Sequence, residues 1–454
     1  MRSEQEVYEV AIVGGGISGA SLLYILSNYT NVNSIVLVEK NQEIALVNSH
    51  KTSNSQTLHF GDIETNYTLE KAKKVNQAAS LVKNYLLQKD PDQEIYSKYH
   101  KMVLAVGTEE VEQLKHRYQE FKQLFPDLRL IDRAEINSIE PNILIGRNPQ
   151  AEVIALFTES GYTIDFQKLA QSFLQQAIRA NAQANAIVPT AKTIDLMMGT
   201  KVKQIHKVGD LYHIQTDQDT IVAKVVAITA GAHSLLFAKS LGYGRDYALL
   251  TIAGNFYLAP GVLNGKVYTM QIKKIPFAAI HGDPEVHDPT QTRFGPTAKV
   301  TLMLERHNYA TVVDYFQTAG LSWAAIKSFI KILSDETIWK YLLRNFSYDL
   351  PVIGKRLFIQ EARKIVPSLK LSELKLARGY GGIRPQIINL KTKKLELGEF
   401  QISGDHISFN ITPSPGASTC LHNASEESKK IVDFLGEQYK FDQDKFWQDL
   451  GLKR

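Results

Sequence analysis

Residues 10–19 read VAIVGGGISG, an apolar run that ends in three consecutive glycines. The spacing Gly14-x-Gly16-x-x-Gly19 then opens a segment with helical periodicity, SLLYILSNY. Glycines at these positions permit a tight turn, allow backbone N–H groups to approach a pyrophosphate, and let the helix pack closely on the strand. The pyrophosphate would lie at the positive end of that helix. The residues predicted to hold it are Gly14, Gly16, Ile17, Ser18 and Gly19.

A second apolar run, IVLV at residues 35–38, is followed by Glu39 and Lys40. An acidic residue about 20 positions after the last glycine is suited to bind the ribose hydroxyls of a dinucleotide. We therefore predict that Glu39 and Lys40 contact a nucleotide. Glycine-rich turns also join strands to helices without any ligand, and this structural alternative stays open. The chain has no second fingerprint of this kind, which favours a single bound nucleotide.

The composition is that of a globular protein with more than one domain. The chain has 454 residues, of which 44% are hydrophobic and 22% charged, so disordered and fibrous classes are excluded. Its net charge of +5 is small and comes without a long Lys/Arg block. It therefore suits an anionic substrate or membrane surface and does not indicate nucleic-acid binding. The single cysteine, Cys420, excludes an internal disulfide and a multi-cysteine metal site, and it favours a reducing compartment.

The N-terminal residues MRSEQEVYEV are charged and contain no apolar region typical of a signal peptide. Nowhere does the sequence contain 18 uninterrupted apolar residues, the length expected of a membrane-spanning helix. We therefore expect a soluble or peripheral protein that does not cross a bilayer.

Periodicity divides the rest of the chain into pieces of two kinds. Helical patterns cover residues 69–87, 109–124 and 323–344, and another begins near Asp165. The first and last thirds have the pattern of a parallel α/β domain, whereas residues 240–300 alternate like antiparallel strands. This order predicts a nucleotide-binding domain interrupted by a second domain that covers it.

A long polar segment, residues 45–68, follows the second strand and reads ALVNSHKTSNSQTLHFGDIETNYT. Long irregular segments within compact domains are often functional. Further along are KIPFAAIHGDP at 274–284, RFGPTA at 293–298, GIRPQ at 382–386 and TPSPGASTC at 412–420. With these motifs, in this order over nearly its whole length, the chain resembles the malate:quinone oxidoreductases. The short type from some Gram-negative bacteria is the most similar, and amino-acid oxidases and 2-hydroxyglutarate dehydrogenases are wider relatives.

This resemblance implies an α/β fold in which a Rossmann-like FAD-binding domain carries an inserted substrate domain with a mixed or antiparallel sheet. The expected FAD-binding domain comprises residues 1–85, 155–240 and 375–454, and the substrate or cap domain comprises 86–154 and 241–374. The implied activity is oxidation of (S)-malate to oxaloacetate, with electrons passed to a membrane quinone. The implied location is the cytoplasmic face of the inner membrane, as a peripheral enzyme.

The resemblance also implies which further residues lie against FAD. They are Ser55, Gln56, Thr57, Val202, Ala230 and Gly231. Short hydroxyl and amide side chains hydrogen-bond flavin heteroatoms without adding charge, but a solvated Ser/Thr loop is the alternative for residues 55–57. For Ala230 and Gly231 the alternative is a close-packed strand end, and for Val202 an ordinary place in the core.

Gly416, Ala417 and Ser418 stand before a predicted C-terminal helix, SEESKKIVDFLGEQY. Free N–H groups at a helix N-terminus can stabilise the negative charge of a reduced flavin. We therefore count these three residues as cofactor-binding, with a simple helix cap as the alternative. Cys420 is expected to pack inside the helix as a small apolar group.

Oxidation of a 2-hydroxy acid requires a base for the hydroxyl proton, and histidine titrates near neutral pH. On the family pattern, His281 in PFAAIHGD is our first choice and His59 our second. A lone loop histidine is otherwise more often a surface residue. The nearby group of His281, Asp283, His287 and Asp288 lacks a zinc-binding spacing, so we predict no metal site.

The carboxylates of malate require cations, and the planar fork of arginine matches their geometry. Arg384 in GGIRPQ and Arg293 before FGPTA match family positions that face the substrate. Gln56 is the third predicted substrate-binding residue. For both arginines a surface salt bridge is the alternative.

The helix that begins at Trp323 is a candidate for membrane contact, within residues 321–345. Apolar and aromatic residues with neighbouring lysines suit an interfacial helix on anionic lipid. A core-facing helix shows the same pattern, and this alternative stays open. The stripe and its flanking lysines are Trp323, Ile326, Lys327, Phe329, Ile330, Lys331 and Leu333.

Three other functions compete with malate oxidation by quinone. The substrate could be L-lactate or L-2-hydroxyglutarate, since each is a 2-hydroxy acid. Electrons could pass to oxygen, as in an oxidase. A non-enzymatic flavin-binding or scaffold protein would keep the glycine turn but would not need His281 and Arg384 to converge on one cleft.

Overall fold

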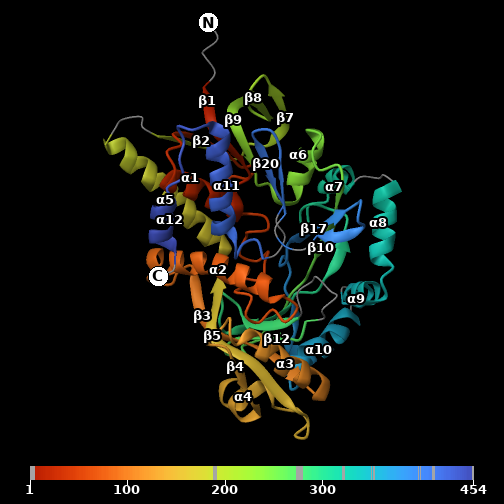
Figure 1. The fold of residues 1–454 in the computed structure, drawn as a ribbon. Helices are drawn as coiled ribbons and strands as arrows, with labels where there is room; N and C mark the ends of the chain where they lie inside the picture. Colours follow the sequence, from red (N-terminus) through yellow and green to blue (C-terminus); the bar gives the residue numbers. More distant parts are fainter. Residues whose placement is uncertain are drawn as a thin grey trace.

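A computed structural model of the chain describes residues 6–187, 192–271, 280–319, 323–348, 350, 353–396, 398, 400–411 and 415–451. Within these ranges, helices surround three β-sheets (Figure 1). The helices are α1 (Ile17–Tyr29), α2 (Leu69–Lys89), α3 (Thr108–Phe121), α4 (Arg133–Ile139), α5 (Phe166–Ile187), α6 (Ser234–Ser240), α7 (Thr311–Ala319), α8 (Trp323–Leu333), α9 (Glu336–Ser347), α10 (Ile353–Ile365), α11 (Cys420–Leu435) and α12 (Gln443–Leu450).

The first sheet has the order β19-β20-β9-β1-β2-β6, and its strands from β20 to β6 run parallel. The hairpin β7–β8 joins it by antiparallel pairing with β9. The strands are β1 (Val7–Val13), β2 (Ser34–Val38), β6 (Thr193–Met197), β7 (Val202–Val208), β8 (Leu211–Thr216), β9 (Thr220–Ile228), β19 (Gln401–Ser403) and β20 (Ile407–Asn410).

Both faces of β1 are buried over residues 10–13, which explains why this part of the strand is continuously apolar. Val10 and Ile12 point into the core that includes residues of α1, α5 and α11. Ala11 and Val13 point to the opposite face, into a core shared with α6 and β8. Figure 1 shows α1, α5 and α11 together on one side of this sheet.

A second, mixed sheet has the order β16-β11-β14-β13-β12-β3-β5-β4, with β12 and β3 parallel and the other pairs antiparallel. A small antiparallel sheet, β15-β10-β17-β18, completes the fold. The strands are β3 (Tyr96–Val106), β4 (Arg129–Ile131), β5 (Val153–Ile164), β10 (Tyr247–Ala253), β11 (Tyr257–Pro260), β12 (Lys266–Thr269), β13 (His281–Pro284), β14 (Gln291–Gly295), β15 (Lys299–Thr301), β16 (Lys375–Leu376), β17 (Ile383–Asn389) and β18 (Lys394–Glu396).

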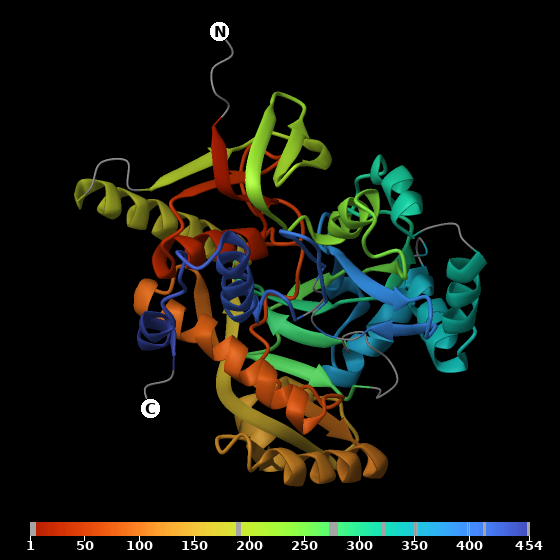
Figure 2. The ribbon, with the colours of Figure 1, turned by 45° about the horizontal axis from the view of Figure 1, so that its top comes forward.

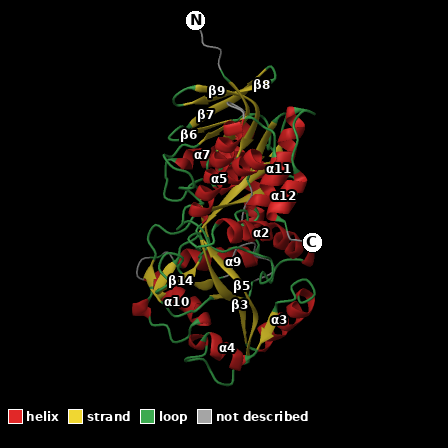
Figure 3. Cartoon of the chain, turned by 90° about the vertical axis from the view of Figure 1, so that its left-hand side faces the viewer, coloured by secondary structure: helices red, strands yellow, loops and turns green. Residues whose placement is uncertain are grey.

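The strand pair β3–β5 connects the two halves of the molecule (Figure 3). At one end, Tyr96 and Ile164 pair with each other and belong to the core of α1 and the parallel sheet. Towards the other end, Val153 and Ala155 belong to the core beneath the mixed sheet. One hydrogen-bonded ladder therefore fixes the two halves relative to each other. Figure 2 shows this curved pair running beside α2.

The predicted fold class is confirmed. The first, middle and last pieces of the chain form a parallel α/β sheet, and the intervening pieces form mixed and antiparallel sheets. The sheets divide the chain differently from two of the expected domain boundaries. Residue 155 lies within β5, which belongs to the mixed sheet, and residues 375–396 supply β16, β17 and β18 to the mixed and antiparallel sheets.

The helix predicted over residues 323–344 is divided in two. Helix α8 ends at Leu333 and α9 begins at Glu336. The cause is Asp335, whose side chain accepts hydrogen bonds from the backbone N–H groups of Thr337 and Ile338 and caps α9. Among the described residues no helix is long and apolar enough to cross a bilayer.

Candidate active site

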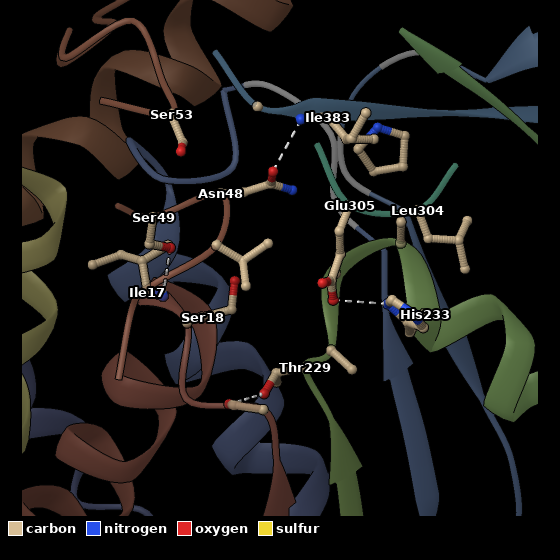
Figure 4. Close-up of a pocket in the computed structure, with 18 of the residues that line it drawn as sticks. Ile17, Ser18, Asn48, Ser49, Ser53, Thr229, His233, Leu304, Glu305 and Ile383 are labelled. Carbon is tan, nitrogen blue, oxygen red and sulfur yellow. Dashed lines mark hydrogen bonds and ion pairs between the residues drawn. The ribbon is translucent and has the colours of Figure 1, made fainter. Parts of the chain in front are cut away.

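A cavity of about 780 Å³ lies between the parallel sheet and the small antiparallel sheet. Its lining includes residues at the carboxyl ends of β1, β2 and β9, where α/β folds bind nucleotides. The opposite wall comes from β10, β17 and α7. Figure 4 shows Ile17, Ser18 and Thr229 on one side and Leu304 and Glu305 on the other. The volume lies in the range typical of cofactor sites.

The three glycines of the first turn have the geometry that the sequence predicts. Gly14 has φ +108°, and a Cβ atom there would lie 2.7 Å from the carbonyl oxygen of Thr229. A Cβ at Gly19 would lie 1.9 Å from the carbonyl oxygen of Gly14, so only glycine lets α1 pack here. Gly16 lines the cavity, and its nearest neighbour would be the Ser49 hydroxyl at 3.5 Å. The backbone is therefore accessible to a ligand at Gly16.

The N-terminus of α1 opens on this cavity without an acidic residue or a side-chain cap at Gly16. Ile17 and Ser18 line the cavity, and the Ile17 N–H donates to the Ser49 hydroxyl at 3.0 Å. A helix end that opens on a cavity with no acidic residue in its first turn is suited to bind phosphate.

Glu39 and Lys40 directly follow β2 and line the cavity. The Glu39 carboxylate is buried and accepts hydrogen bonds from the N–H groups of Gly15 at 2.7 Å and Asn41 at 2.9 Å. Its orientation is therefore fixed before any ligand binds. Lys40 forms an ion pair with Glu305 across the cavity.

Most other residues predicted to bind a cofactor also line this cavity. They are Ser55, Thr57, Val202, Ala230, Gly231, Gly416, Ala417 and Ser418. The Ser418 hydroxyl accepts a hydrogen bond from the backbone N–H of His59 at 2.9 Å. The turn before α11 is thereby joined to the polar segment.

Gln56 does not line the cavity, although its neighbours do. It is fully buried, and its backbone has φ +52°, a left-handed conformation that is uncommon for residues other than glycine. Its amide nitrogen donates to the Lys51 carbonyl and to the Glu285 carboxylate, both at 2.9 Å. The side chain thus fixes the polar segment from behind.

His59 lines the cavity and is held by a buried carboxylate. Its Nδ1 lies 2.6 Å from Glu64 Oε1, and its Nε2 lies 3.4 Å from the Ser55 hydroxyl. Burial opposes ionisation of Glu64, but the hydrogen bond and charge of His59, with the charge of Lys101, outweigh it and lower the pKa of Glu64. The carboxylate therefore orients the imidazole.

His281 lies in a buried layer on β13 and is not part of the cavity lining. Its ring packs on Tyr268 with centroids 4.7 Å apart, and its Nε2 lies 3.9 Å from Asp283 Oδ1. The Tyr268 hydroxyl is in turn 3.3 Å from the Thr57 hydroxyl, which faces the cavity. One layer of side chains thus separates His281 from the cavity.

Arg384 on β17 is half-buried and lines the cavity. Burial lowers the pKa of its guanidinium, and the nearby phenol groups of Tyr341 and Tyr67 act in the opposite direction. Among the described residues, no carboxylate forms an ion pair with Arg384. A desolvated cation without an internal counter-ion is suited to bind an anionic ligand.

Arg293, the other predicted arginine, is fully buried and does not line the cavity. Its Nη2 lies 2.9 Å from Asp283 Oδ2 and donates to the Ser55 carbonyl at 2.7 Å. Its Nη1 donates to the Asn54 carbonyl at 3.1 Å. The guanidinium therefore holds the backbone of the polar segment.

Lys266 completes a buried cluster with Asp283 and Arg293. Its Nζ donates to Asp283 at 2.9 Å and to the Thr57 hydroxyl at 3.1 Å. Burial disfavours the charge of Asp283, but Arg293 and Lys266 outweigh it and hold the pKa of this carboxyl far below its usual range. The Lys266–Asp283–Arg293 cluster thus supports the cavity wall at residues 54–57.

Several lining residues had not been predicted. The side-chain amide oxygen of Asn48 accepts a hydrogen bond from the Ile383 backbone N–H at 3.0 Å, which joins the polar segment to β17 (Figure 4). His233 lies 3.7 Å from Glu305 and 3.5 Å from Asp314, and burial lowers its pKa. His233 directly follows the turn of small residues at the end of β9. This position could have identified it from the sequence as a residue of the cavity. Residues 274–279 and 412–414 of the quoted motifs lie outside the described residues.

Comparison with known proteins agrees with this geometry. The family model for malate:quinone oxidoreductase (Mqo) matches residues 6–432. A probable malate:quinone oxidoreductase of Campylobacter jejuni is 40% identical, covering 98% of this chain and 99% of that protein. A malate:quinone oxidoreductase of Helicobacter pylori is 39% identical, with 98% of each chain covered.

The fold has a known counterpart in a solved structure. L-α-glycerophosphate oxidase of Mycoplasma pneumoniae, determined with FAD bound, superimposes with a TM-score of 0.64 at 18% identity, covering 94% of this chain and 95% of that one. At this identity the likeness concerns the fold. The family match and the two bacterial relatives extend over nearly the entire sequence. The chain therefore belongs to the malate:quinone oxidoreductase family.

Proposed function

We propose that this protein oxidises (S)-malate to oxaloacetate with FAD bound in the cavity and passes the electrons to a membrane quinone. Family membership supports the reaction. The observation that carries the proposal is the half-buried Arg384, which lines the cavity and has no ion-paired carboxylate among the described residues. A half-buried guanidinium of this kind favours a ligand that brings its own carboxylate.

The residues around the cavity fit a flavin dinucleotide. Gly16 and the first turn of α1 would hold the pyrophosphate, and Glu39 would hold ribose hydroxyls. Ser55, Thr57 and the turn before α11 would lie beside the ring system. Bound FAD supplies two-electron chemistry, because it accepts electrons from an alcohol carbon and releases them to a quinone.

Substrate binding is assigned to Arg384. Its planar fork can pair with one carboxylate of malate through two parallel hydrogen bonds. Desolvation strengthens such a pair, because the surrounding medium screens it less than water does. We do not assign a substrate contact to Arg293 or Gln56, whose hydrogen-bonding groups are directed to the protein itself.

Proton transfer from the C2 hydroxyl is assigned to His59. This imidazole lines the cavity, and Glu64 holds its Nδ1 so that Nε2 is the nitrogen available to accept a proton. His281 lies one layer behind, in contact with Tyr268. His281 remains the alternative base, since the family pattern selects it.

An anaerobic titration tests this function. The purified protein should carry a flavin spectrum that bleaches with (S)-malate, and an added quinone analogue should restore the colour. L-Lactate and L-2-hydroxyglutarate should bleach the flavin only at higher concentrations or more slowly. Bleaching by lactate without bleaching by malate would contradict the substrate assignment, and peroxide formation in place of quinone reduction would contradict the acceptor.

A further inference from the structure

Exposed apolar side chains are concentrated in one part of the sequence. Among the described residues, 12 of the 21 exposed large apolar or aromatic side chains lie within residues 302–357, about one eighth of the chain. Isolated exposed apolar residues are ordinary, but a dense set marks an interaction surface. This set is Leu302, Tyr309, Val313, Phe316, Trp323, Ile330, Trp339, Leu343, Phe346, Leu350, Ile353 and Leu357.

The spacing of these side chains places them on the outer faces of helices. On α9 the exposed residues Trp339, Leu343 and Phe346 follow the i, i+4, i+7 pattern of one helix face. The inner face of the same helix is formed by Leu342 and Asn345, which are buried. Helix α9 therefore presents apolar side chains to solvent as well as to the protein.

Helices α7 and α8 repeat this arrangement. Tyr309, Val313 and Phe316 have the same spacing at α7 and are all exposed. On α8, Trp323 and Ile330 lie two turns apart and are 75% and 60% exposed. The apolar stripe predicted on α8 therefore faces two ways. Trp323 and Ile330 face solvent, whereas its other apolar residues are half-buried. Of these, Phe329 and Leu333 pack inward beside the antiparallel sheet.

Cations accompany the apolar side chains. Lys327 and Lys331 are exposed on α8, and Arg356 is exposed on α10. None of these three forms an ion pair with a carboxylate of the described chain. Exposed aromatic residues flanked by unpaired lysine and arginine are typical of helices that lie in the interface of an anionic membrane.

These four helices lie along one side of the molecule. Figures 1 and 2 show α7 and α8 at the edge opposite α5 and α12, and Figure 1 shows α9 and α10 continuing that edge. Helix α7 also forms part of the cavity wall through Thr311, Asp314 and Gln317, while Val313 and Phe316 are exposed. The apolar surface and the cofactor cavity are thus separated by a single helix.

We propose that the outer faces of α7 to α10 rest on an anionic lipid bilayer, which places the α7 wall of the cavity at the membrane. The chemistry of the surface selects this occupant, because aromatic and aliphatic side chains can enter the acyl boundary while lysine and arginine contact lipid phosphates. The inference rests on the proposed function where it concerns electron transfer to quinone, since that acceptor dissolves in the bilayer. The lipid contact itself is independent of any activity.

Flotation of the full-length, flavin-loaded protein with vesicles tests the contact. We expect binding to vesicles of phosphatidylcholine mixed with phosphatidylglycerol, weaker binding to phosphatidylcholine alone, and release by high salt. The double variant Trp339→Glu/Phe346→Glu should bind at least about tenfold more weakly, because it adds two charges to the apolar face. The matched control Leu87→Glu/Ile145→Glu changes two similarly exposed residues elsewhere and should bind like the wild type.

Activity measurements separate this proposal from the assignment of the reaction. Both double variants should oxidise malate normally with a soluble dye as acceptor, and only the α9 variant should lose reduction of a long-chain quinone embedded in vesicles. Equal vesicle binding by wild type and the α9 variant would overturn the proposal. A wild-type dimer that the α9 substitutions dissociate, without vesicle binding, would assign the surface to a second copy of the chain. If malate oxidation failed in all proteins while flotation behaved as expected, only the proposed reaction would be contradicted.

Discussion

Arg384 and Arg293 were both predicted to bind the substrate, but the structure gives them different surroundings. Arg293 is fully buried, pairs with Asp283 and donates to two backbone carbonyls. Arg384 lines the cavity and has no ion-paired carboxylate among the described residues. The two arginines differ in their ion pairing. Asp283 is the counter-ion of Arg293, whereas the described part of the chain provides no carboxylate for Arg384. We therefore expect Arg384 to act on the ligand and Arg293 to act on the protein.

The largest expected effect is on Arg384. Substitution Arg384→Ala removes one partner of a buried ion pair with the substrate, which typically costs about 3–5 kcal/mol. We expect kcat/KM for malate to fall by about a thousandfold, with FAD content unchanged, and Arg384→Lys to recover part of the loss. The exposed Arg378→Ala is the matched control. An unchanged KM for malate in Arg384→Ala would refute the assignment.

The next effect concerns stability. Asp283→Asn leaves the cations of Lys266 and Arg293 buried without their counter-ion, so the free energy of unfolding should fall by about 3 kcal/mol. Denaturant titration measures this, with the exposed Asp127→Asn as control. Since the pKa of Asp283 lies below its unfolded value, its stabilisation is complete above the ordinary carboxyl pKa of about 4 and disappears as pH falls through the folded-state pKa. The difference between the two proteins should therefore shrink only in acid.

The third prediction separates the two histidines. His59→Asn removes the proposed proton acceptor, and general-base catalysis contributes about a hundredfold or more. We expect a fall in kcat of that size without loss of flavin. The exposed His116→Asn should have no effect. A larger fall in kcat in His281→Asn than in His59→Asn, with flavin retained in both, would assign the base to His281.

The smallest effect is expected at Arg293. Arg293→Lys keeps the charge but loses the fork that spans Asp283 and the carbonyls of residues 54–55, so it should cost about 1–2 kcal/mol of stability. Faster release of FAD on dilution should accompany this, because the cavity wall loses support. The KM for malate should remain within about threefold of the wild type. A rise in KM as large as that of Arg384→Lys would contradict the assignment of Arg293 to a structural role.

Local sequence was enough to predict the glycine turn and the acidic residue at one end of the cavity. The glycine spacing, the apolar strands and the position of Glu39 are determined within about 30 residues, the length of one βαβ unit. The structure shows the tight turn at Gly14 and the close helix packing at Gly19 that this spacing predicts. The polar segment was recognised as unusual from its composition and length, and it lines the cavity.

The sequence did not reveal the contacts that depend on the pairing of distant strands. Asp283 and Arg293 are ten positions apart but stand directly opposite each other on β13 and β14. Predicting that register would have identified the cross-strand ion pair and hence the internal role of Arg293. The sequence did not reveal that Gln56 lies behind the cavity wall while Ser55 and Thr57 line the cavity. Its backbone is left-handed, and its side chain bonds to Lys51 and Glu285. The break between α8 and α9 was readable in principle, since Asp335 is a favourable N-cap.

The solitary Cys420 is useful for labelling experiments. Burial raises the pKa of its thiol to about 12, so hardly any thiolate forms near neutral pH and alkylating reagents should not react with it. A cysteine introduced by Phe346→Cys would then be the one reactive thiol in the folded protein. A fluorescent or spin probe attached at residue 346 would report the depth of this position in a bilayer. Cys420 would not have to be replaced first.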